Sequence, residues 1–253
     1  WVSVVELVFY IPTLILALIV CSRHGFRRSS GWVYTLVLCI VRIVGAICQL
    51  VSYHDHSSGV ITATAVIDSI GLSPLLLATL GVLSRFVDFI NAKSGATFTV
   101  KHFRLLQVLI TVGLVLNIVG GTSGNVQPDG KIEVQTTSKV GIILFIVSHV
   151  GLVLVYAASV PRTACVPPKE RRVPVALLLA LPFVLVRLVY SACAVFLHNH
   201  LFNIITGSVP VYVVMAVVEE FIVVAIYLLL GFAVDKLDDT QQGPLASRPW
   251  KGK

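Results

Sequence analysis

Seven apolar runs, each about as long as a membrane-spanning helix, leave this chain of 253 residues few ways to fold. With 57% hydrophobic and 12% charged residues, the chain is too apolar for a soluble domain. We predict an all-α membrane protein, a seven-transmembrane helix bundle over residues 1–233, with a polar tail over 234–253 that we expect to be disordered. The runs lie near residues 3–22, 31–53, 60–84, 104–121, 139–159, 173–197 and 207–233.

Lysine and arginine are distributed unevenly over the connections between these runs. If the first connection faces the cytoplasm, that side collects fifteen of the 19 basic residues, and the other side holds Lys131 and Lys139. Cytoplasmic loops carry such an excess, so we predict an outer N-terminus and a cytoplasmic C-terminus. The net charge of +7 then reflects topology and anionic lipid headgroups, not nucleic acid. We expect a multi-pass protein of the endoplasmic reticulum or plasma membrane, with the lipid bilayer as its partner.

Two segments of the chain resemble each other. The second run contains "VRIVGAIC" (41–48) and the sixth contains "VRLVYSAC" (186–193), and the runs that follow them carry "AVID", ending at Asp68, and "AVVE", ending at Glu219. Valine-rich helices often match by chance. A duplication would instead relate runs one to three to runs five to seven as a parallel 3+1+3 repeat, with run four as the linker.

Ionisable residues inside the predicted spans are the main functional signal, because each costs at least a few kcal/mol unless it is paired or hydrated. Four carboxyls face two arginines, so we expect at least one carboxyl to keep its proton and to be able to act as a general acid. The candidate catalytic residues are Glu219, Glu220, Asp68 and Glu6. The candidate substrate-binding residues are Arg42, Arg187, Gln49, Tyr10, Tyr53, Tyr190, Asn117 and His149.

Each of these residues also has a purely structural interpretation. Buried arginine–acid pairs hold helices together, Glu6 can reach the outer interface, and His149 can simply bond a neighbouring helix. Two His-x-His pairs on one predicted face are weak metal candidates, because they lack a carboxylate or cysteine frame, and we predict neither a metal site nor a cofactor. Those histidines are His54, His56, His198 and His200.

Several known seven-span and enzyme classes are excluded by missing residues. A retinal Schiff base needs a lysine in the interior of a late span, and no predicted span here has one, since Lys139 only marks the start of the fifth run. The chain also has no serine nucleophile elbow, no HExxH and no glycine-rich phosphate loop.

Four stretches of the chain are distinctive: "HGFRRSSGWVYTLVLCIVRIVGAICQL", "SIGLSPLLLATLGVLSR", "LALPFVLVRLVYS" and "AVVEEFIVVAIYLLLGF". Through stretches such as these, nearly the whole chain, to about residue 233, resembles a fungal family of seven-span integral membrane proteins of unassigned function. The resemblance implies seven helices in a filamentous-fungal membrane. Fungal meroterpenoid biosynthesis uses small seven-span terpene cyclases that protonate an epoxide or alkene with buried carboxylates, and this chain is similar to them in architecture and acid chemistry, not in motif.

The leading hypothesis is therefore a membrane-embedded cyclase or isomerase. It would act on a lipophilic prenylated substrate, a terpenoid or meroterpenoid, by carboxylic-acid protonation. The alternative is a small-solute or proton-coupled transporter, or a seven-span ligand-sensing receptor. A closed, largely apolar pocket that holds a neutral acid favours the enzyme, and a polar path to both membrane faces favours the transporter.

Overall fold

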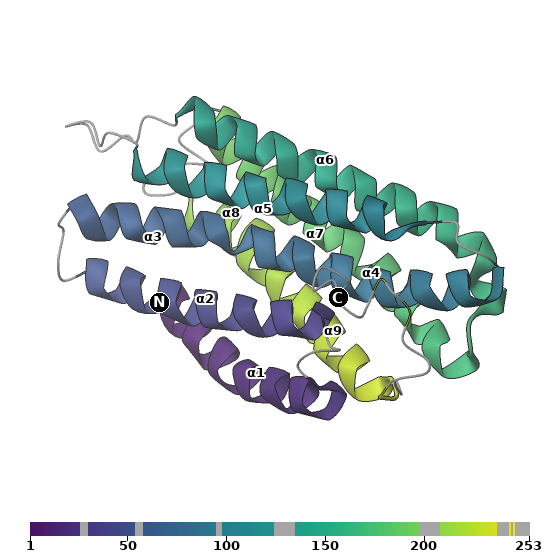
Figure 1. Cartoon of the computed structure of the whole chain (residues 1–253). Coiled ribbons are helices and arrows are strands. Elements are labelled where there is room, and N and C mark those ends of the chain that lie inside the picture. The colour runs from purple at the N-terminus through teal and green to yellow at the C-terminus, as the bar shows by residue number, and fades with distance from the viewer. Residues whose placement is uncertain are drawn as a thin grey trace.

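The computed structural model describes residues 1–25, 30–53, 58–94, 98–123, 135–197 and 208–236, together with Gly243 and Leu245. Within these ranges the chain is helical and contains no strand. The helices run roughly side by side along one long axis (Figure 1).

Nine α-helices, two 3₁₀ helices and one π-helix are found in the described chain. The α-helices are α1 (Val2–His24), α2 (Ser30–Ser52), α3 (Ser58–Ile70), α4 (Leu72–Ser94), α5 (Val100–Thr122), α6 (Thr136–Ser159), α7 (Arg172–Phe196), α8 (Val209–Tyr212) and α9 (Glu219–Ala233). Two 3₁₀ helices, η1 (Val160–Cys165) and η2 (Pro168–Arg171), join α6 to α7. A π-helix, η4 (Val213–Val218), joins α8 to α9.

The predicted seven spans are confirmed by length and apolarity. They are Val2–His24, Gly31–Ser52, Val66–Lys93, Val100–Thr122, Thr136–Thr163, Arg172–Phe196 and Val209–Ala233. Six of the seven agree with the sequence boundaries within a few residues. The third was predicted to end at residue 84 but continues to Lys93.

Buried, paired charges explain the longer third span. Arg85 and Asp88, which we placed in a polar connection, are only 5% and 6% exposed. Arg85 donates to both carboxylate oxygens of Glu170, at 2.9 and 2.6 Å, and to the Asp235 carbonyl at 2.8 Å. Asp88 accepts the Leu245 amide at 3.1 Å. Because partners compensate both charges, the helix can carry them inside the bundle.

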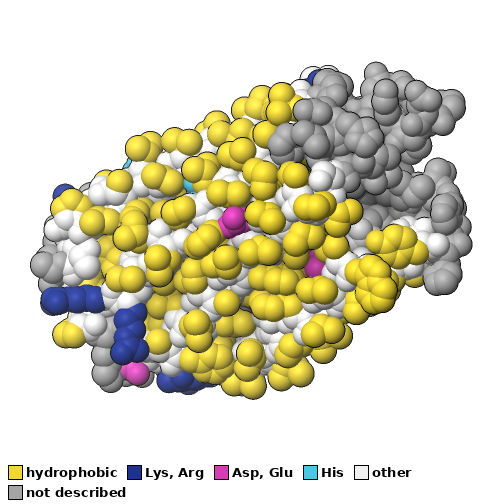
Figure 2. Space-filling model, turned by 180° about the vertical axis from the view of Figure 1, so that it is seen from behind, with side chains coloured by type: hydrophobic (Ala, Val, Ile, Leu, Met, Phe, Trp, Pro, Cys, Tyr) yellow, Lys and Arg dark blue, Asp and Glu magenta, His cyan; other side chains and the backbone are white. Residues whose placement is uncertain are grey.

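Sequential spans are neighbours, and the third span occupies the centre. Each of α1, α2, α4, α5, α6 and α7 packs on the next span in chain order, and α9 returns to α1 and α2. Helix α4 contacts α2, α5, α6 and α7, and Leu75, Leu76, Phe86 and Val87 on it are fully buried. The outer faces expose apolar side chains, as expected for contact with lipid (Figure 2).

The two ends of the bundle differ in charge. We call them the N-end, where α1 begins, and the C-end, where α9 ends. The exposed basic residues described at the C-end are Arg23, Lys93, Lys101, Arg104, Arg162, Arg171, Arg172 and Lys236. Arg23 and Arg172 donate to the carbonyls of Phe232 and Ala233, at 3.0 and 3.3 Å. Cations in this position stabilise the C-terminus of a helix.

Candidate functional site

Five ionisable side chains from five spans meet inside the N-end half of the bundle. Glu6, Arg42, Arg187 and Glu220 are 4%, 6%, 1% and 1% exposed, and the Asp68 side chain is 15% exposed. We call these five residues the ionic cluster. They are drawn from α1, α2, α3, α7 and α9, so the tertiary fold alone brings them together.

Arg42 lies at the centre of the ionic cluster. Its Nε and Nη2 donate to the two oxygens of Glu220 as a two-pronged pair, and its Nη1 donates to Asp68 Oδ1 at 2.6 Å. Such bidentate, charge-assisted bonds are the strongest class of hydrogen bond in proteins. Arg42 thereby joins α2 to both α3 and α9.

Arg187 contacts the same two carboxylates from the other side. Its Nη2 lies 3.6 Å from Asp68 Oδ1 and its Nε lies 3.6 Å from Glu220 Oε2. It also donates to Ser191 Oγ at 2.8 Å and to the Asp68 carbonyl at 3.3 Å. Of the adjacent Glu219 and Glu220, Glu220 is the one that lies against Arg187. Two guanidinium groups thus balance two carboxylates.

Glu6 is a third carboxyl without a matching arginine. Neither arginine of the cluster forms an ion pair with Glu6 in the described part of the chain. The Tyr212 hydroxyl lies 3.2 Å from Asp68 Oδ1 and 3.5 Å from Glu6 Oε1. This hydroxyl has one proton, so it can donate to only one carboxyl at a time. When the Tyr212 hydroxyl donates to Asp68, its contact with Glu6 can be a hydrogen bond only if Glu6 is protonated and donates to the tyrosine oxygen.

Aromatic side chains cover the cluster on the seam between α1 and α9. Tyr10 is 1% exposed and donates to Glu220 Oε1 at 2.9 Å. Phe9 of α1 stacks on Phe221 of α9, with ring centroids 3.8 Å apart, and Tyr10 meets Phe221 edge-on at 5.2 Å. These rings shield the Tyr10–Glu220 bond, because they lie next to it on both helices.

A break in the third span makes room for Arg42. Gly71 separates α3 from α4, and a Cβ added there would lie 2.7 Å from Arg42 Nη2 and 2.8 Å from Cζ. The guanidinium therefore lies directly against the backbone of the break. Pro74 follows in the first turn of α4. Amides in the first turn have no acceptor within the helix, so the missing amide proton of proline costs no hydrogen bond there.

The π-helix η4 aligns Tyr212 with Glu220. In an α-helix, residues eight apart are offset by about 80° around the axis. A π turn accommodates one additional residue, so the offset becomes that of residues seven apart, about −20°. The π turn therefore places Tyr212 and Glu220 on the same side of the seventh span, so that both side chains reach the cluster.

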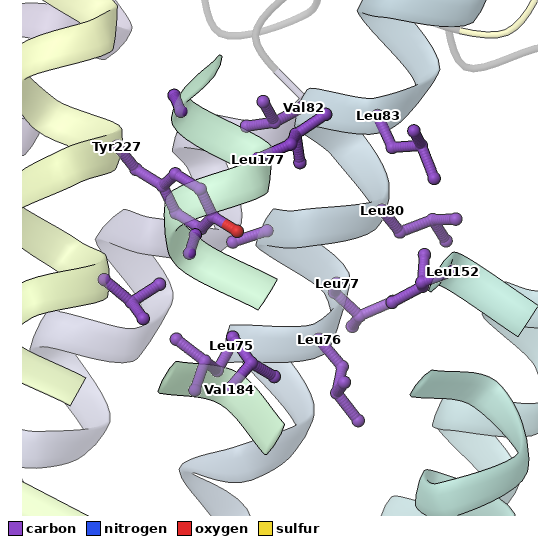
Figure 3. Packing of buried hydrophobic residues seen from close by; sticks show 14 of the residues in the cluster. Leu75, Leu76, Leu77, Leu80, Val82, Leu83, Leu152, Leu177, Val184 and Tyr227 are labelled. Carbon is purple, nitrogen blue, oxygen red and sulfur yellow. The ribbon is translucent and has the colours of Figure 1, made fainter. Parts of the chain in front are cut away.

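The cluster is closed toward the C-end by an apolar layer one helical turn away. Its members are Leu38, Leu75, Leu76, Val184, Val223 and Val224, all fully buried. Figure 3 shows Leu75, Leu76 and Val184 in this layer, with Tyr227 nearer the C-end. The Tyr227 hydroxyl is used locally, at 2.7 Å from Thr79 Oγ1. Within the described residues we therefore find no polar path from the cluster to the C-end.

A small pocket adjoins the cluster. Asp68, Ser69, Arg187, Tyr190 and Ser191 line it together with apolar residues of α6 and α7, and its volume of about 20 Å³ holds roughly one water molecule. The Arg187 guanidinium lies 5.8 Å from the Tyr190 ring centroid. Asp68 is the cluster carboxyl that lines this pocket.

The other predicted site residues lie outside the cluster. Gln49 accepts a bond from Ser3 at 2.8 Å near the N-end, and Tyr53 is 56% exposed. Asn117 donates to Gly113 within α5, and buried His149 on α6 has an Nδ1 without a partner in the described residues. Glu219 points away from the cluster and is treated below. The four loop histidines His54, His56, His198 and His200 lie outside the described residues.

Sequence reasoning missed Tyr212 and the pairing of Arg85 with Glu170. A search for tyrosines near span ends would have found Tyr212, but its alignment depends on the π turn. Among described residues, no group of three or more His, Cys, Asp or Glu side chains forms a metal-binding arrangement.

Comparison with known proteins gives a family but no activity. The family model described as "Domain of unknown function (DUF7702)" matches residues 1–237, a range that includes all seven spans and the whole ionic cluster. No curated protein matches the chain.

Proposed function

We propose that this chain, which belongs to the family described as "Domain of unknown function (DUF7702)", is a membrane-embedded cyclase or isomerase. Its substrate is a lipophilic prenylated molecule, a terpenoid or meroterpenoid, which it protonates with a buried carboxylic acid. One observation carries the proposal: three carboxyls lie in a site that has only two arginines and is closed by apolar residues toward the C-end. This arrangement holds one surplus proton in a dry environment, as general acid catalysis requires.

The contacts suggest a role for each group in the proton transfer. Glu6 stores the surplus proton, Tyr212 relays it, and Asp68 delivers it, because Asp68 contacts Tyr212 and also lines the pocket. Asp68 is therefore the catalytic residue, and Glu6 acts through it. Glu220, which we first considered as a donor, is held by both prongs of Arg42 and serves as a fixed negative charge.

The reaction conserves mass. The proton adds to an alkene carbon or an epoxide oxygen, the resulting cation forms a ring or shifts its double bond, and a proton leaves a neighbouring carbon for the Asp68 carboxylate. The ionised pair of Asp68 and Glu220 and the face of Tyr190 stabilise the positive charge as it develops. The pocket holds roughly one water molecule, so the reacting group enters it and the prenyl chain extends toward the bilayer.

The distribution of charge supports one proposed membrane orientation. The described basic residues gather at the C-end (Figure 2), which supports a cytoplasmic C-end and an outer N-end. The site then faces the lumenal or extracellular half of a fungal endoplasmic reticulum or plasma membrane.

A proton-coupled transporter is the second candidate. Both the third and the seventh span are interrupted beside the ionic cluster, at Gly71 and at η4. In transporters built from repeats, interrupted helices at corresponding positions mark the binding site. This observation favours a parallel 3+1+3 repeat. In that repeat Arg42 of the second span corresponds to Arg187 of the sixth, and the interrupted third span corresponds to the interrupted seventh.

Product analysis tests the enzyme proposal. Wild type, Asp68→Asn, Tyr212→Phe and Tyr34→Phe are produced in a heterologous fungus that is fed prenylphenol epoxides, and lipid extracts are compared by mass spectrometry. We expect a new isomer of unchanged mass with wild type and Tyr34→Phe, a loss with Asp68→Asn, and at least a tenfold reduction with Tyr212→Phe. Tyr34 is a matched control, because it is also half-buried but bonds Gln107 on α5.

Two results would count against it. Folded wild-type protein that yields no isomer across a broad set of prenylated substrates contradicts an enzyme. Solute-dependent proton uptake into proteoliposomes, without any product, would establish the transporter instead.

A further inference from the structure

Glu219 lies on a different side of α9 from the ionic cluster. Glu220 faces the cluster, and Phe221 faces α1, where it stacks on Phe9. Consecutive residues in an α-helix differ by about 100°, so Glu219 faces the flank opposite Phe221. Helix α7 also packs on α9, and α1 lies on the Phe221 side. Three consecutive residues therefore point to three different surroundings.

The surroundings of Glu219 are apolar and open to lipid. The Glu219 side chain is partly exposed, and Val214 and Val218 just before it are 59% and 40% exposed. Leu185 and Val189 of α7 are 47% and 43% exposed. Glu219 is thus a carboxyl at the border between the bundle and the bilayer.

Within the described chain, Glu219 lacks a polar partner. Its Oε2 is buried and accepts no hydrogen bond from any described residue. Arg42 and Arg187 are engaged by Glu220, Asp68 and Ser191. An ionised carboxylate without a partner is costly in the hydrocarbon region, so Glu219 holds a proton. A neutral carboxylic acid here presents one O–H donor that needs an acceptor.

We propose that Glu219 is a separate, bilayer-facing binding site for the uncharged acceptor oxygen of a lipophilic molecule. An ether, carbonyl or epoxide oxygen satisfies the carboxylic O–H, and the apolar remainder lies against Val214, Val218 and the lipid face of α7. The exposed neighbours on both helices are apolar, so the ligand is neutral and not a cation. This site does not depend on proton transfer in the ionic cluster.

A lipophilic carbodiimide tests the protonated state of Glu219. In dicyclohexylcarbodiimide, the carboxylic O–H adds across an N=C bond, and the O-acylisourea rearranges to an N-acylurea without a leaving group. Labelled peptides are identified by mass spectrometry after reaction of the full-length protein in phospholipid vesicles. We expect the adduct on Glu219 and not on buried Glu6 or Glu220, and its loss in Glu219→Gln. A water-soluble cationic carbodiimide should label Glu219 at least tenfold more slowly.

Protection from labelling tests the ligand class. Farnesyl methyl ether, which carries an acceptor oxygen, should slow labelling at least threefold, and the hydrocarbon farnesane at the same membrane concentration should not. The result must be the same in Asp68→Asn, because labelling needs no turnover, and so a failure of the proposed enzyme leaves this test intact.

Three outcomes would overturn the proposal. The first is labelling of Glu220 in place of Glu219, and the second is equal protection by the hydrocarbon. The third is slower labelling of Glu219 at higher protein-to-lipid ratios but not at higher concentrations of farnesyl methyl ether. That result would mean that Glu219 contacts a second copy of the chain.

Discussion

Replacing Gly71 by alanine should destabilise the protein by disturbing the centre of the ionic cluster. The added Cβ would lie 2.7 Å from Arg42 Nη2, 2.8 Å from Cζ and 3.0 Å from Nε. A flexible side chain can usually retreat from such a clash. The Arg42 guanidinium is held by Glu220 and Asp68, so retreat breaks or lengthens charge-assisted hydrogen bonds.

The size of the effect follows from two independent estimates. Overpacking a well-packed site typically costs about 1–3 kcal/mol. Loss of one hydrogen bond to a charged group costs about 1.5–3 kcal/mol. We therefore expect Gly71→Ala to lower the free energy of unfolding by about 2 kcal/mol. In a chain of this size each kcal/mol corresponds to about 2–4 °C, so the melting temperature should fall by roughly 4–8 °C.

Thermal unfolding of the purified protein in one detergent measures this change, with Gly59→Ala as the matched control. Gly59 lies in α3, and a Cβ added there meets no atom within 4 Å, so its substitution should change stability by less than about 0.5 kcal/mol. In an Arg42→Lys background, Gly71→Ala should cost at least twofold less, because the shorter ammonium group leaves the space empty. Equal melting temperatures for Gly71→Ala and Gly59→Ala would refute the reasoning.

Three further predictions concern the same bundle. Deleting Val214 should convert η4 to an α-helix and rotate Tyr212 by about 100° away from the cluster. Tyr212→Phe should then lower the free energy of unfolding by about 1 kcal/mol in the wild-type protein and leave it unchanged in the deletion variant, as measured by thermal unfolding. Glu170→Ala removes the carboxylate that neutralises buried Arg85 and should lower the free energy of unfolding by about 3–5 kcal/mol. The Arg85→Met, Glu170→Met double variant should recover most of that loss in the same assay. Tyr227→Phe should lower unfolding free energy by only about 1 kcal/mol, because Thr79 still donates to the Leu75 carbonyl at 2.9 Å; a loss above 3 kcal/mol would contradict this account.

Hydropathy was sufficient to predict the number of spans, because a bilayer requires each backbone polar group to be satisfied within its own helix. It was wrong about the end of the third span. From the sequence alone, Arg85 and Asp88 were assigned to a loop. Their partners, Glu170 and the Leu245 amide, lie far away in the sequence, so the pairing of the two charges could not be foreseen. Span ends that carry paired charges cannot be placed by a window average.

The members of the ionic cluster could be predicted, but the two-pronged pairing of Arg42 with Glu220 could not. Arg42, Asp68, Arg187, Glu6 and Glu220 all stand out as intramembrane charges. The choice between Glu219 and Glu220 depends on the rotation of α9, and η4 sets that rotation by accommodating one additional residue. A regular helical wheel places Tyr212 about 80° from Glu220, which is why sequence reasoning did not connect them.

Stability alone does not account for this cluster. Replacing a buried ion pair by well-packed apolar residues is often neutral or stabilising, and a membrane interior adds to the cost of each charge. Here the chain also interrupts two spans beside the same group, with Gly71 making room for Arg42 and η4 turning Tyr212 toward Asp68. π turns are frequent at functional sites. Because a third carboxyl without an arginine, a glycine break and a π turn lie together at this cluster, we propose that the cluster serves proton chemistry in addition to holding the helices together.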